Sequence, residues 1–503
     1  MSTETEVKMG AWAGFDLPSL DGVADDVTSV ARVPRTLMAV YYDTADLRLA
    51  RWGVTVRHRT GDGSGSGSGS GWTVKLPEGD EGPALVRREL NFEGPPGRMP
   101  AGATSLIRAY ARDTPLVPVA RIRTVRTGVD LLDSEGAGVA EVVDDEVSVL
   151  HGGRVASRFR EVEVELGARP PAGLLDTVVA RLRDAGAGEP DSTPKVIRAL
   201  GARALGPPEV APVTLGKNPT AADLVRRAVS AAVDRIMRHD QGVRIGDDPE
   251  DVHQARVGTR RLRSDLRTFG SLLDEEWLAS LRDELRWLAG ALGAVRDADV
   301  LIDRLRRQAA TLPEPDTGAL APIFRRLAIE RDQARAELLE VMESPRYVAL
   351  LKRLIDAARQ PRCRKGADAP AEDVVPGLVA GPWRKLRKAV AALPADPPDP
   401  DLHQVRILAK RTRYAAEAAA PLVGKKAASF ASAVAGLQEV LGDHQDAVVA
   451  ETWLRRAVEG ADAAVCLAAG ELIALQMAQA AEGRRRWRKA WDKASADKLR
   501  SWM

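Results

Sequence analysis

The hydrophobic pattern of this chain changes its period once, near residue 204, and that change limits the possible folds more than any other feature. Up to about residue 166, short segments alternate apolar and polar residues, which is typical of β-strands. From about residue 220 onward the chain is rich in Ala, Leu and Arg at helical spacing, and Pro and Gly interrupt both patterns in between. We therefore expect an α+β protein, with a strand-rich domain at 1–203, a linker at 204–216 and an all-α domain at 217–503.

The strand-rich half contains alternating segments at 3–9, 38–43, 53–60, 71–76, 84–92, 119–133, 138–149 and 157–166. The tract GDGSGSGSGSG (61–71) lies between two of these segments and predicts a flexible hairpin tip. Helices are expected near 170–186 and 194–203, where they would close this half.

The second half repeats itself. HQARVGTRRLR (253–263) matches HQVRILAKRTR (403–413), and LGAVRDA (292–298) matches LGDHQDA (441–447) at nearly the same offset. Two matching strings at one offset indicate an internal duplication, with repeats at about 217–370 and 371–503. Helices are expected near 220–240, 250–270, 275–292, 296–311, 319–342, 345–359, 375–392, 400–420, 424–440, 444–458, 461–480 and 484–500.

Charged residues occupy alternating positions in nearly every expected strand. Examples are Glu4, Glu6 and Lys8 in the first strand and Glu161 to Glu165 in the last. For any single strand, a solvated outer face explains such a pattern. Like carboxylates two residues apart repel unless a cation lies among them, so a closed barrel with a polar lumen is the alternative for the whole set. There the acids would hold a divalent metal, with Mg²⁺ or Mn²⁺ favoured over zinc by oxygen-only ligands, and Arg and Lys would grip an anion beside it.

The same residues resemble a known family. ETEVK (4–8) fits the ExExK signature of CYTH domains, the triphosphate tunnel metalloenzymes, and VRHR, WTVKL, RRE, RIRTVR, VVDD, a late ExE and PKVIRAL follow in the order of that family. The resemblance covers about residues 2–203. It implies an eight-stranded antiparallel β tunnel that hydrolyses or rearranges triphosphates with Mg²⁺ or Mn²⁺.

The resemblance also implies roles for individual residues. Phosphoryl oxygens would be bound by Lys8, Arg57, Arg59, Lys75, Arg87, Arg121 and Arg123, with Lys195 and Arg198 reaching the tunnel mouth. The implied metal ligands are Glu4, Glu6, Asp145, Glu163 and Glu165. Glu89 or Glu161 would orient the attacking water, and the sequence leaves that choice open. It also leaves open the register at Arg121, Arg123 and Arg126 and at Asp144 and Asp145, because a shift of one residue exchanges inward for outward.

A basic stripe occurs once in each helical repeat. Its members fall within an arc of roughly 80° on one helix, and they are His253, Arg256, Arg260, Arg263 and Arg267 in the first repeat and His403, Arg406, Lys410 and Arg413 in the second. Charged helix faces are usually just solvated. Here, however, neighbours one turn apart repel, and such a stripe is best tolerated when an anion lies across it.

The helical half resembles the CHAD domain over about residues 215–503, through its two HQxRxxxxRxxR strings, the RDAD at 296–299 and the DHQD at 443–446. That family implies binding of inorganic polyphosphate in a basic cavity between two helical repeats. Binding of such a polyanion should depend strongly on salt. The resemblance also implies that the protein associates with polyphosphate granules in the cytoplasm.

Three classes of function compete. The first is a metal-dependent triphosphatase whose helical half binds polyphosphate; the second is a polyphosphate-binding and targeting protein without catalysis; the third is nucleic-acid binding. Lys and Arg number 73 against 71 Asp and Glu, and aromatic residues are only 4% of the chain, so a nucleic-acid coat or base-stacking protein has little support. The acidic set favours the enzyme, because binding an anion alone needs few carboxylates.

The remaining composition sets the expected location. No run of apolar residues is long enough to span a membrane, and the start of the chain lacks the pattern of a secretory signal. The two cysteines, Cys363 and Cys466, form no disulfide framework and no zinc motif. We therefore expect a cytoplasmic protein without a membrane partner, and the sequence says nothing of its oligomeric state.

Overall fold

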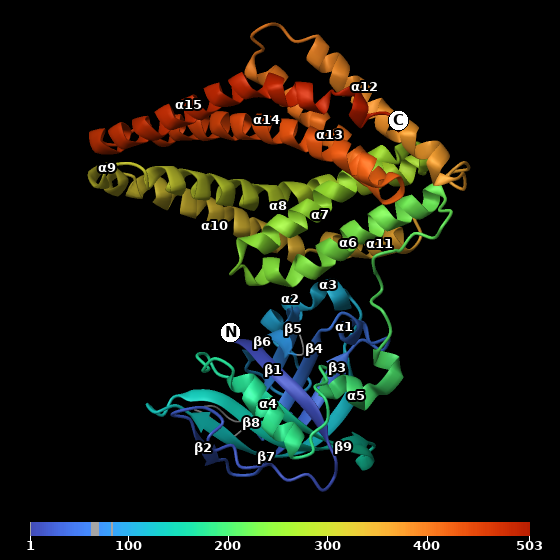
Figure 1. Ribbon diagram of the computed structural model, residues 1–503, viewed down its shortest axis with the longest axis vertical. Helices are drawn as coiled ribbons and strands as arrows, with labels where there is room; N and C mark the ends of the chain where they lie inside the picture. Colours follow the sequence, from blue (N-terminus) through green and yellow to red (C-terminus); the bar gives the residue numbers. More distant parts are fainter. Residues whose placement is uncertain (1, 62–69, 82–83) are drawn as a thin grey trace. The chain divides into compact units, whose positions relative to one another are not determined.

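The computed structural model describes the backbone at residues 2–61, 70–81 and 84–503, and side chains at 6–61, 70–77 and 86–503. The chain divides into two compact units, Met1–Glu209 and Val210–Met503 (Figure 1). The first unit is built mainly from strands and the second from helices, as the change of period predicts.

The strands of the first unit form one antiparallel sheet that closes on itself. Around the ring the order is β3-β4-β5-β6-β1-β9-β8-β7, and β7 pairs with both β8 and β3. The eight-stranded tunnel is thereby confirmed within the described residues. The bounds are β1 Ser2–Ala11, β3 Arg35–Asp43, β4 Thr55–Thr60, β5 Ser70–Glu81, β6 Ala84–Phe92, β7 Val117–Leu132, β8 Gly138–His151 and β9 Arg154–Leu166.

Several short elements were not expected from the sequence. A further strand, β2 (Thr28–Ala31), extends the sheet along β7, and α1 (Arg48–Arg51), α2 (Ala101–Leu106) and α3 (Arg108–Ala111) lie in the connections. Residues 62–69 of the Gly/Ser tract lie outside the described residues, but the strands that flank the tract, β4 and β5, pair with each other.

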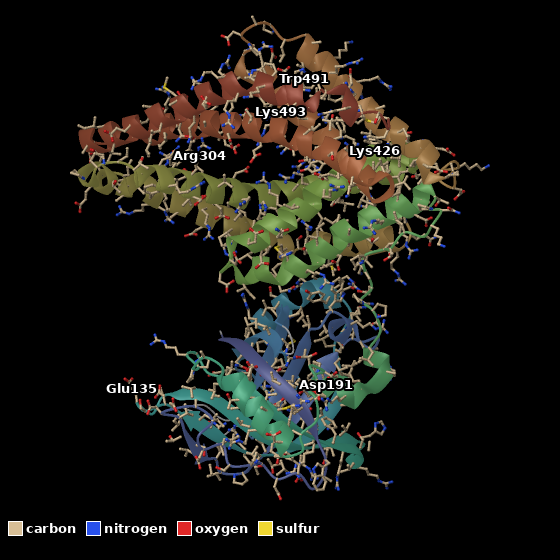
Figure 2. The ribbon with its side chains drawn as sticks, in the orientation of Figure 1. Glu135, Asp191, Arg304, Lys426, Trp491 and Lys493 are labelled. Carbon is tan, nitrogen blue, oxygen red and sulfur yellow. The ribbon has the colours of Figure 1, made fainter. Side chains whose placement is uncertain are left out.

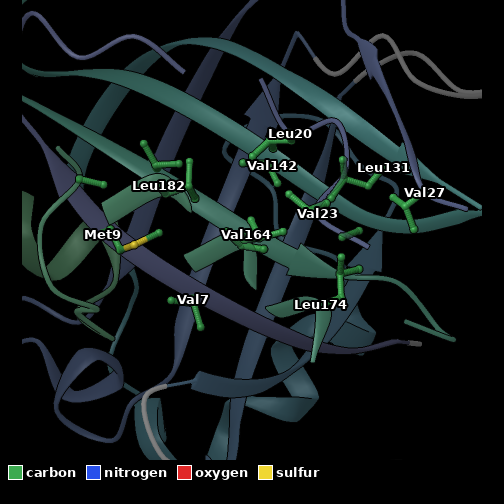
Figure 3. Close-up of a cluster of buried hydrophobic side chains, with 14 of the residues drawn as sticks. Val7, Met9, Leu20, Val23, Val27, Leu131, Val142, Val164, Leu174 and Leu182 are labelled. Atoms are coloured by element: carbon green, nitrogen blue, oxygen red, sulfur yellow. The ribbon is translucent and has the colours of Figure 1, made fainter. Parts of the chain in front are cut away.

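The two faces of the strands have opposite chemistry. On the outside of the ring, alternate residues of β1, β8 and β9 pack with α4 (Leu174–Asp184) in an apolar cluster that includes Val7, Met9, Val142, Val164 and Leu182 (Figure 3). Because side chains alternate along a strand, the residues between them face the interior of the ring. This apolar cluster therefore lies outside the barrel, and many of the charged residues line its inside.

One end of the barrel interior is closed by α5 (Lys195–Leu200), which η1 (Gly201–Ala204) follows. Val196 and Ile197 of this helix pack in an apolar cluster with Ile122 of β7 and Val147 of β8. This packing fixes Lys195, at the start of the helix, over the polar interior.

The second unit contains two similar sets of helices. The first repeat consists of α6 (Ala221–Ile245), α7 (Pro249–Thr268), α8 (Glu275–Ala309), α9 (Glu314–Ala319), α10 (Ala321–Glu343) and α11 (Pro345–Arg359). The second consists of α12 (Ala371–Ala391), α13 (Asp399–Val423), α14 (Lys425–Ala457) and α15 (Ala463–Ala494). In both repeats the long third helix lies along a partner, α8 along α10 and α14 along α15 (Figure 1).

The sequence predicted breaks near 293–295, 441–443 and 481–483, and these are wrong. Gly293, Gly442 and Gly483 all lie inside continuous helices. A glycine inside a helix costs only about 1 kcal/mol relative to alanine, and packing of the long helices outweighs that cost. At Gly483 a Cβ would lie 2.8 Å from the Cβ of His444, so glycine is required there for α15 to approach α14 closely.

Among the described residues, one helix, α15, contains a window long and apolar enough to cross a membrane by length and composition alone. Ala468, Ala469 and Leu472 of that window are buried in an apolar cluster with residues of α8, α10 and α14. That packing gives this part of α15 a role in the helical core.

Candidate functional site in the tunnel and the basic helices

A polar cavity of about 240 Å³ lies inside the ring of strands. Every strand of the ring and α5 contribute to it, so residues far apart in sequence meet there. The lining includes these residues expected from the sequence: Glu6, Lys8, Arg57, Arg59, Lys75, Arg87, Glu89, Asp145, Glu163, Glu165 and Lys195.

Opposite charges are brought together by the strand register. Residues directly opposite on antiparallel strands point to the same face, and Lys8 lies opposite Glu163, Lys75 opposite Glu89 and Arg126 opposite Asp145. The alternating charges of the sequence therefore meet inside the barrel as ion pairs.

Lys195 lies at the centre of the most acidic part of the cavity. Its Nζ is 2.8 Å from Asp145 Oδ2, 2.8 Å from Glu161 Oε1 and 2.8 Å from Glu163 Oε2. Burial alone would lower the pKa of Lys195, but the three carboxylates raise it above its ordinary value. Burial likewise opposes ionisation of Glu163 and Asp145, but Lys195 and the other nearby cations together outweigh it and lower the pKa of both acids.

Lys8 bridges two further acids. Its Nζ lies 2.7 Å from Glu163 Oε1 and 3.2 Å from Glu6 Oε1, and Arg87 Nη2 donates to Glu6 Oε1 at 2.6 Å. Burial raises the pKa of Glu6, but Lys8 and the other nearby cations outweigh it and bring it to about 2. Glu6 is therefore ionised in the folded protein at neutral pH.

The two candidates for orienting water lie in different surroundings. Glu89 lines the cavity, 2.8 Å from Lys75 Nζ, and although burial opposes ionisation, Lys75 and Arg57 lower its pKa to about 2. Glu161 is fully buried beneath Lys195 and is not among the lining residues. Burial raises the pKa of Glu161 above its usual range.

Cations crowd another part of the lining. Burial and the neighbouring Arg57 and Arg126 lower the pKa of Arg59 to about 9. Burial and the neighbours Arg32 and Arg126 lower the pKa of Arg35. Like charges raise each other's free energy, and an anion placed among them relieves that repulsion. This part of the wall is suited to phosphoryl oxygens.

Three of the cations expected to bind phosphoryl oxygens, Arg121, Arg123 and Arg198, do not line the cavity. Arg121 and Arg123 are exposed on the outer face of β7, so the prediction that they face the tunnel is wrong. The inward face of β7 carries Ile122, Thr124 and Arg126 instead, because Arg126 lies directly opposite the inward-facing Asp145.

Arg198 is held beside the cavity, not in it. Its Nη2 donates to Asp191 Oδ2 at 2.9 Å, and its Nε lies 3.6 Å from Glu161 Oε2, so these acids draw it away from the lumen. The ambiguity at 144 and 145 is resolved: Asp145 faces inward, whereas Asp144 accepts hydrogen bonds from Arg160 outside the ring. The side chain of Glu4 lies outside the described residues, and its backbone pairs with Arg87.

Five ionisable lining residues were given no role in the site from the sequence: Arg32, Arg35, Tyr41, Arg126 and Glu141. Arg126 had a usable signal, because the turn DSEGA at 133–137 joins β7 to β8 and sets it opposite Asp145. Arg32 lies in the connection after β2, and no strand pattern marks it.

The carboxylates expected as metal ligands are neutralised here by side chains. Lys8 and Lys195 occupy the space between them, and among the described residues no group of three or more His, Cys, Asp or Glu side chains is arranged to hold a metal ion. Carboxylate oxygens suit a hard divalent cation, but a cation in this cluster requires the ion pairs to rearrange.

In the helical unit, the two basic stripes lie on helices that contact each other, α7 and α13. The pKa of Lys410 is lowered to about 8, first by burial and then by the nearby Arg406 and Arg260. Because Arg260 belongs to the first repeat and Arg406 to the second, cations of both repeats lie close together here. Burial and the neighbour Arg296 lower the pKa of His253. The shared region consists of Arg256, Arg260, Arg406 and Lys410, and we call it the basic centre.

The duplication is visible in matching ion pairs. Arg256 Nη1 donates to Asp297 Oδ1 at 2.7 Å in the first repeat, and Arg406 Nη2 donates to Asp446 Oδ1 at 3.4 Å in the second. Both acids belong to the strings RDAD and DHQD that marked the repeat. Each pair therefore anchors one stripe to the long third helix of its own repeat.

Other stripe members lie apart from the basic centre. The pKa of Arg267 is lowered to about 10 by burial and by its neighbours Arg411 of α13 and Arg282 of α8. Burial and the cations of α8 also lower the pKa of Arg263. Arg413 pairs with Glu417 at 3.2 Å and stacks over Tyr414. His403 lies on α13 one turn before Arg406.

A cavity of about 490 Å³ in the helical unit lies where α8, α14 and α15 meet. Arg304, labelled in Figure 2, lines it with Arg307 and Arg486, and its Nε donates to Gln476 Oε1 at 2.8 Å. These cations were not singled out from the sequence, because they lie on helices without a basic stripe.

Comparison with known proteins agrees with this architecture. The CYTH domain model matches residues 2–197, and the CHAD domain model matches residues 227–455. The uncharacterized protein MT2285 of Mycobacterium tuberculosis is 34% identical over 479 residues, which cover 90% of this chain and 88% of that protein.

Two solved structures match part of the chain. PptA from Streptomyces chartreusis is 26% identical and covers 55% of this chain and 99% of its own, with a TM-score of 0.47. The CHAD domain from the plant Ricinus communis is 28% identical and covers 56% of this chain and 95% of its own, with a TM-score of 0.46. From the two matched domains and the relative that spans nearly the whole chain, this protein belongs to the family in which a CYTH domain is followed by a CHAD domain.

Proposed function

We propose that the tunnel hydrolyses inorganic triphosphate, or a closely related triphosphate, with Mg²⁺ or Mn²⁺, and that the helical domain binds inorganic polyphosphate. The family supports a triphosphate-related role and is metal-dependent. CYTH domains include triphosphatases and adenylyl cyclases, so the choice of hydrolysis rests on the cavity of this chain.

The observation that carries the proposal is the mixed lining of the tunnel cavity. Arg35, Arg57, Arg59 and Arg126 offer guanidinium groups on the same cavity that Glu6, Glu89 and Glu163 line with carboxylates. An anion-binding protein needs the cations but gains nothing from buried acids. Phosphoryl transfer needs both, because its catalysis is mostly positioning and neutralisation of charge on the transferred group.

Inorganic triphosphate suits the cavity better than a nucleotide does. Most of the described lining is charged, and Tyr41 is its one aromatic residue. The apolar lining residues are Leu37, Ala39, Ile122, Pro194 and Val196, and three of them, Ala39, Ile122 and Val196, pack in the cluster at the end closed by α5. The charged residues outnumber them, so the cavity suits a small, highly charged anion better than a nucleobase.

Glu89 is better placed than Glu161 to orient the attacking water. It lines the cavity and is ionised at neutral pH, so it accepts a hydrogen bond from water, whereas Glu161 is covered by Lys195. Glu89→Gln should therefore reduce turnover of tripolyphosphate more than it reduces binding.

The test is release of phosphate from tripolyphosphate by the full-length protein, measured with Mg²⁺ and with Mn²⁺, for the wild type and Glu6→Gln. A parallel assay measures retention of polyphosphate by a variant with Arg256, Arg260, Arg406 and Lys410 changed to Ala. We expect Glu6→Gln to lose cleavage and keep retention, and the quadruple variant to do the reverse.

The alternative is a polyphosphate-binding and targeting protein without catalysis. Absence of turnover with several metals and at several pH values would support that alternative. Equal loss of both activities in the quadruple variant would mean that the two domains share one site.

A further inference from the structure

A cavity of about 360 Å³ in the helical unit has an apolar wall beside its charged residues, and it shares Arg260 with the basic centre. It lies between α6, α7 and α13, and we call it the α6–α13 cavity. Its lining combines apolar residues with arginines: Leu224, Ala228, Ala231, Ala232, Val257, Gly258, Ala418 and Pro421 with Arg227, Arg235, Arg260, Arg261 and Arg413, together with Asp265, Tyr414 and Glu417.

Small residues on facing helices create the apolar wall. A Cβ at Gly258 of α7 would lie 2.9 Å from Ile236 Cγ1 and 3.1 Å from the carbonyl oxygen of Ala232, so only glycine lets α7 approach α6 this closely. On α6 the wall repeats at helical spacing through Leu224, Ala228 and Ala231.

The charged part of the wall has an excess of arginine. Glu417 accepts hydrogen bonds from Arg261 and lies 3.2 Å from Arg413 Nε, so it offsets part of that charge. Guanidinium groups of Arg413 and Arg260 lie over the Tyr414 ring, at 4.8 Å and 6.0 Å from its centroid. Because five arginines face two carboxylates, the cavity favours an anion.

Two buried polar atoms of the wall have no hydrogen-bond partner. Asp265 is 1% exposed, its Oδ2 accepts from Arg261 Nε at 2.9 Å, and its Oδ1 is left without a partner. Arg260 Nε is buried and equally unpartnered. A buried polar atom without a partner costs about 1–3 kcal/mol, and a ligand that supplies a donor and an acceptor recovers that cost.

We propose that the α6–α13 cavity binds a phosphate ester of a nitrogen heterocycle, of which nucleoside monophosphates are the simplest representatives. The phosphate lies against Arg260 and Arg413, a ring N–H donates to Asp265 Oδ1, and the ring packs on the alanine wall. Inorganic polyphosphate fits this cavity poorly, because it has no apolar part and no ring donor. A cavity of this volume lies near the lower end of roughly 300–1,000 Å³ seen for small-molecule sites.

The experiment measures binding of adenosine 5′-monophosphate and guanosine 5′-monophosphate to the full-length protein by calorimetry. Ala231→Trp fills the exposed side of the cavity, and Ala478→Trp, at an exposed position of α15, is the matched control. We expect affinity for at least one nucleotide to fall about tenfold or more in Ala231→Trp and to stay within about twofold in Ala478→Trp.

Competitors separate this site from the tunnel and from the basic centre. Adenosine and guanosine without phosphate should bind at least about tenfold more weakly, and pyrophosphate should not displace the nucleotide. Arg260 belongs to both this cavity and the basic centre, so both other activities are measured in the same variant. Tripolyphosphate cleavage and polyphosphate retention should be unchanged in Ala231→Trp, because this substitution leaves Arg256, Arg406 and Lys410 in place. If Ala231→Trp fails to fold, Ala228→Leu is the smaller filling variant.

Three results would overturn the proposal. One is that neither nucleotide binds the wild type at millimolar concentration. Another is that the nucleotide binds equally well to the wild type and to Ala231→Trp, which would show that it binds outside this cavity. Full displacement of the nucleotide by pyrophosphate would likewise overturn the proposal, because it would show that the site recognises only the phosphate group.

Discussion

Lys195 Nζ lies 2.8 Å from Asp145 Oδ2, and α5 thereby places an ammonium group among three carboxylates of the tunnel. This contact joins the end of the first unit to the middle of β8. It helps to lower the pKa of Asp145 and Glu163 although both are buried, so the closing helix contributes to the electrostatics of the site as well as covering it.

Replacing Lys195 should destabilise the strand domain, because the acidic cluster would lose its compensating positive charge. Removing one partner of a buried ion pair leaves an uncompensated charge and typically costs about 3–5 kcal/mol. We expect Lys195→Met to lower the unfolding temperature of the strand domain, and added Mn²⁺ to restore more of it than it adds to the wild type. Differential scanning calorimetry measures both effects, and Lys426→Met, at an exposed lysine (Figure 2), is the control. An unchanged unfolding temperature would show that Lys195 does not compensate these acids.

Inward and outward arginines of β7 offer a matched pair. Arg126 lines the cavity, whereas Arg123 is exposed on the opposite face of the same strand. Loss of one charge-assisted contact to a phosphoryl group should reduce kcat/KM for tripolyphosphate roughly 100-fold in Arg126→Ala, with partial rescue in Arg126→Lys. Arg123→Ala should change it less than about twofold. Equal effects of the two alanine variants would mean that the register of β7 does not determine which arginine meets the substrate.

The stability of the strand domain should fall in acid because of Glu6 and Glu89. Nearby cations hold the pKa of each at about 2, below its ordinary value of 4.5. A lowered pKa in the folded state contributes stability above about pH 4.5 that is lost as the pH falls toward 2. We expect the free energy of unfolding in urea to drop by on the order of 2 kcal/mol per group between pH 5 and pH 2.5. Glu6→Gln should flatten this dependence, and a profile as steep as that of the wild type would contradict it.

The helical domain should show the opposite dependence because of Asp265. Burial raises its pKa to about 7, against the ordinary 3.8, even though Arg261 opposes the shift. The folded state then binds more protons than the unfolded state, so stability falls as the pH rises from about 4 to about 7.

We expect Asp265→Asn to remove this fall and to be more stable than the wild type at pH 8 by on the order of 2 kcal/mol. At pH 4.5 the two proteins should differ little. Urea unfolding followed at both pH values measures the difference, and a variant less stable at pH 8 would show that the ion pair with Arg261 outweighs the burial of the charge.

Much of this protein was determined by the local pattern of its sequence. Alternating charges such as Glu6 and Lys8 predict strands with a polar face, and a duplicated arginine stripe predicts paired helices, because both patterns depend only on the spacing of side chains along one element. The order of the two domains and most of the charged residues of the tunnel lining were expected from these patterns and from the family resemblance that they carry.

Tertiary structure decided what spacing leaves open. Alternation of side chains gives a strand two faces but does not determine which face is inside the barrel. The pairing of β7 with β8 determines this, because it sets Arg126 opposite the inward-facing Asp145 and leaves Arg123 on the outer face. Packing of the long helices kept Gly483 inside α15, although glycine favours a break. The α6–α13 cavity and the place of Lys195 depend on elements far apart in the chain, and no local period encodes such contacts.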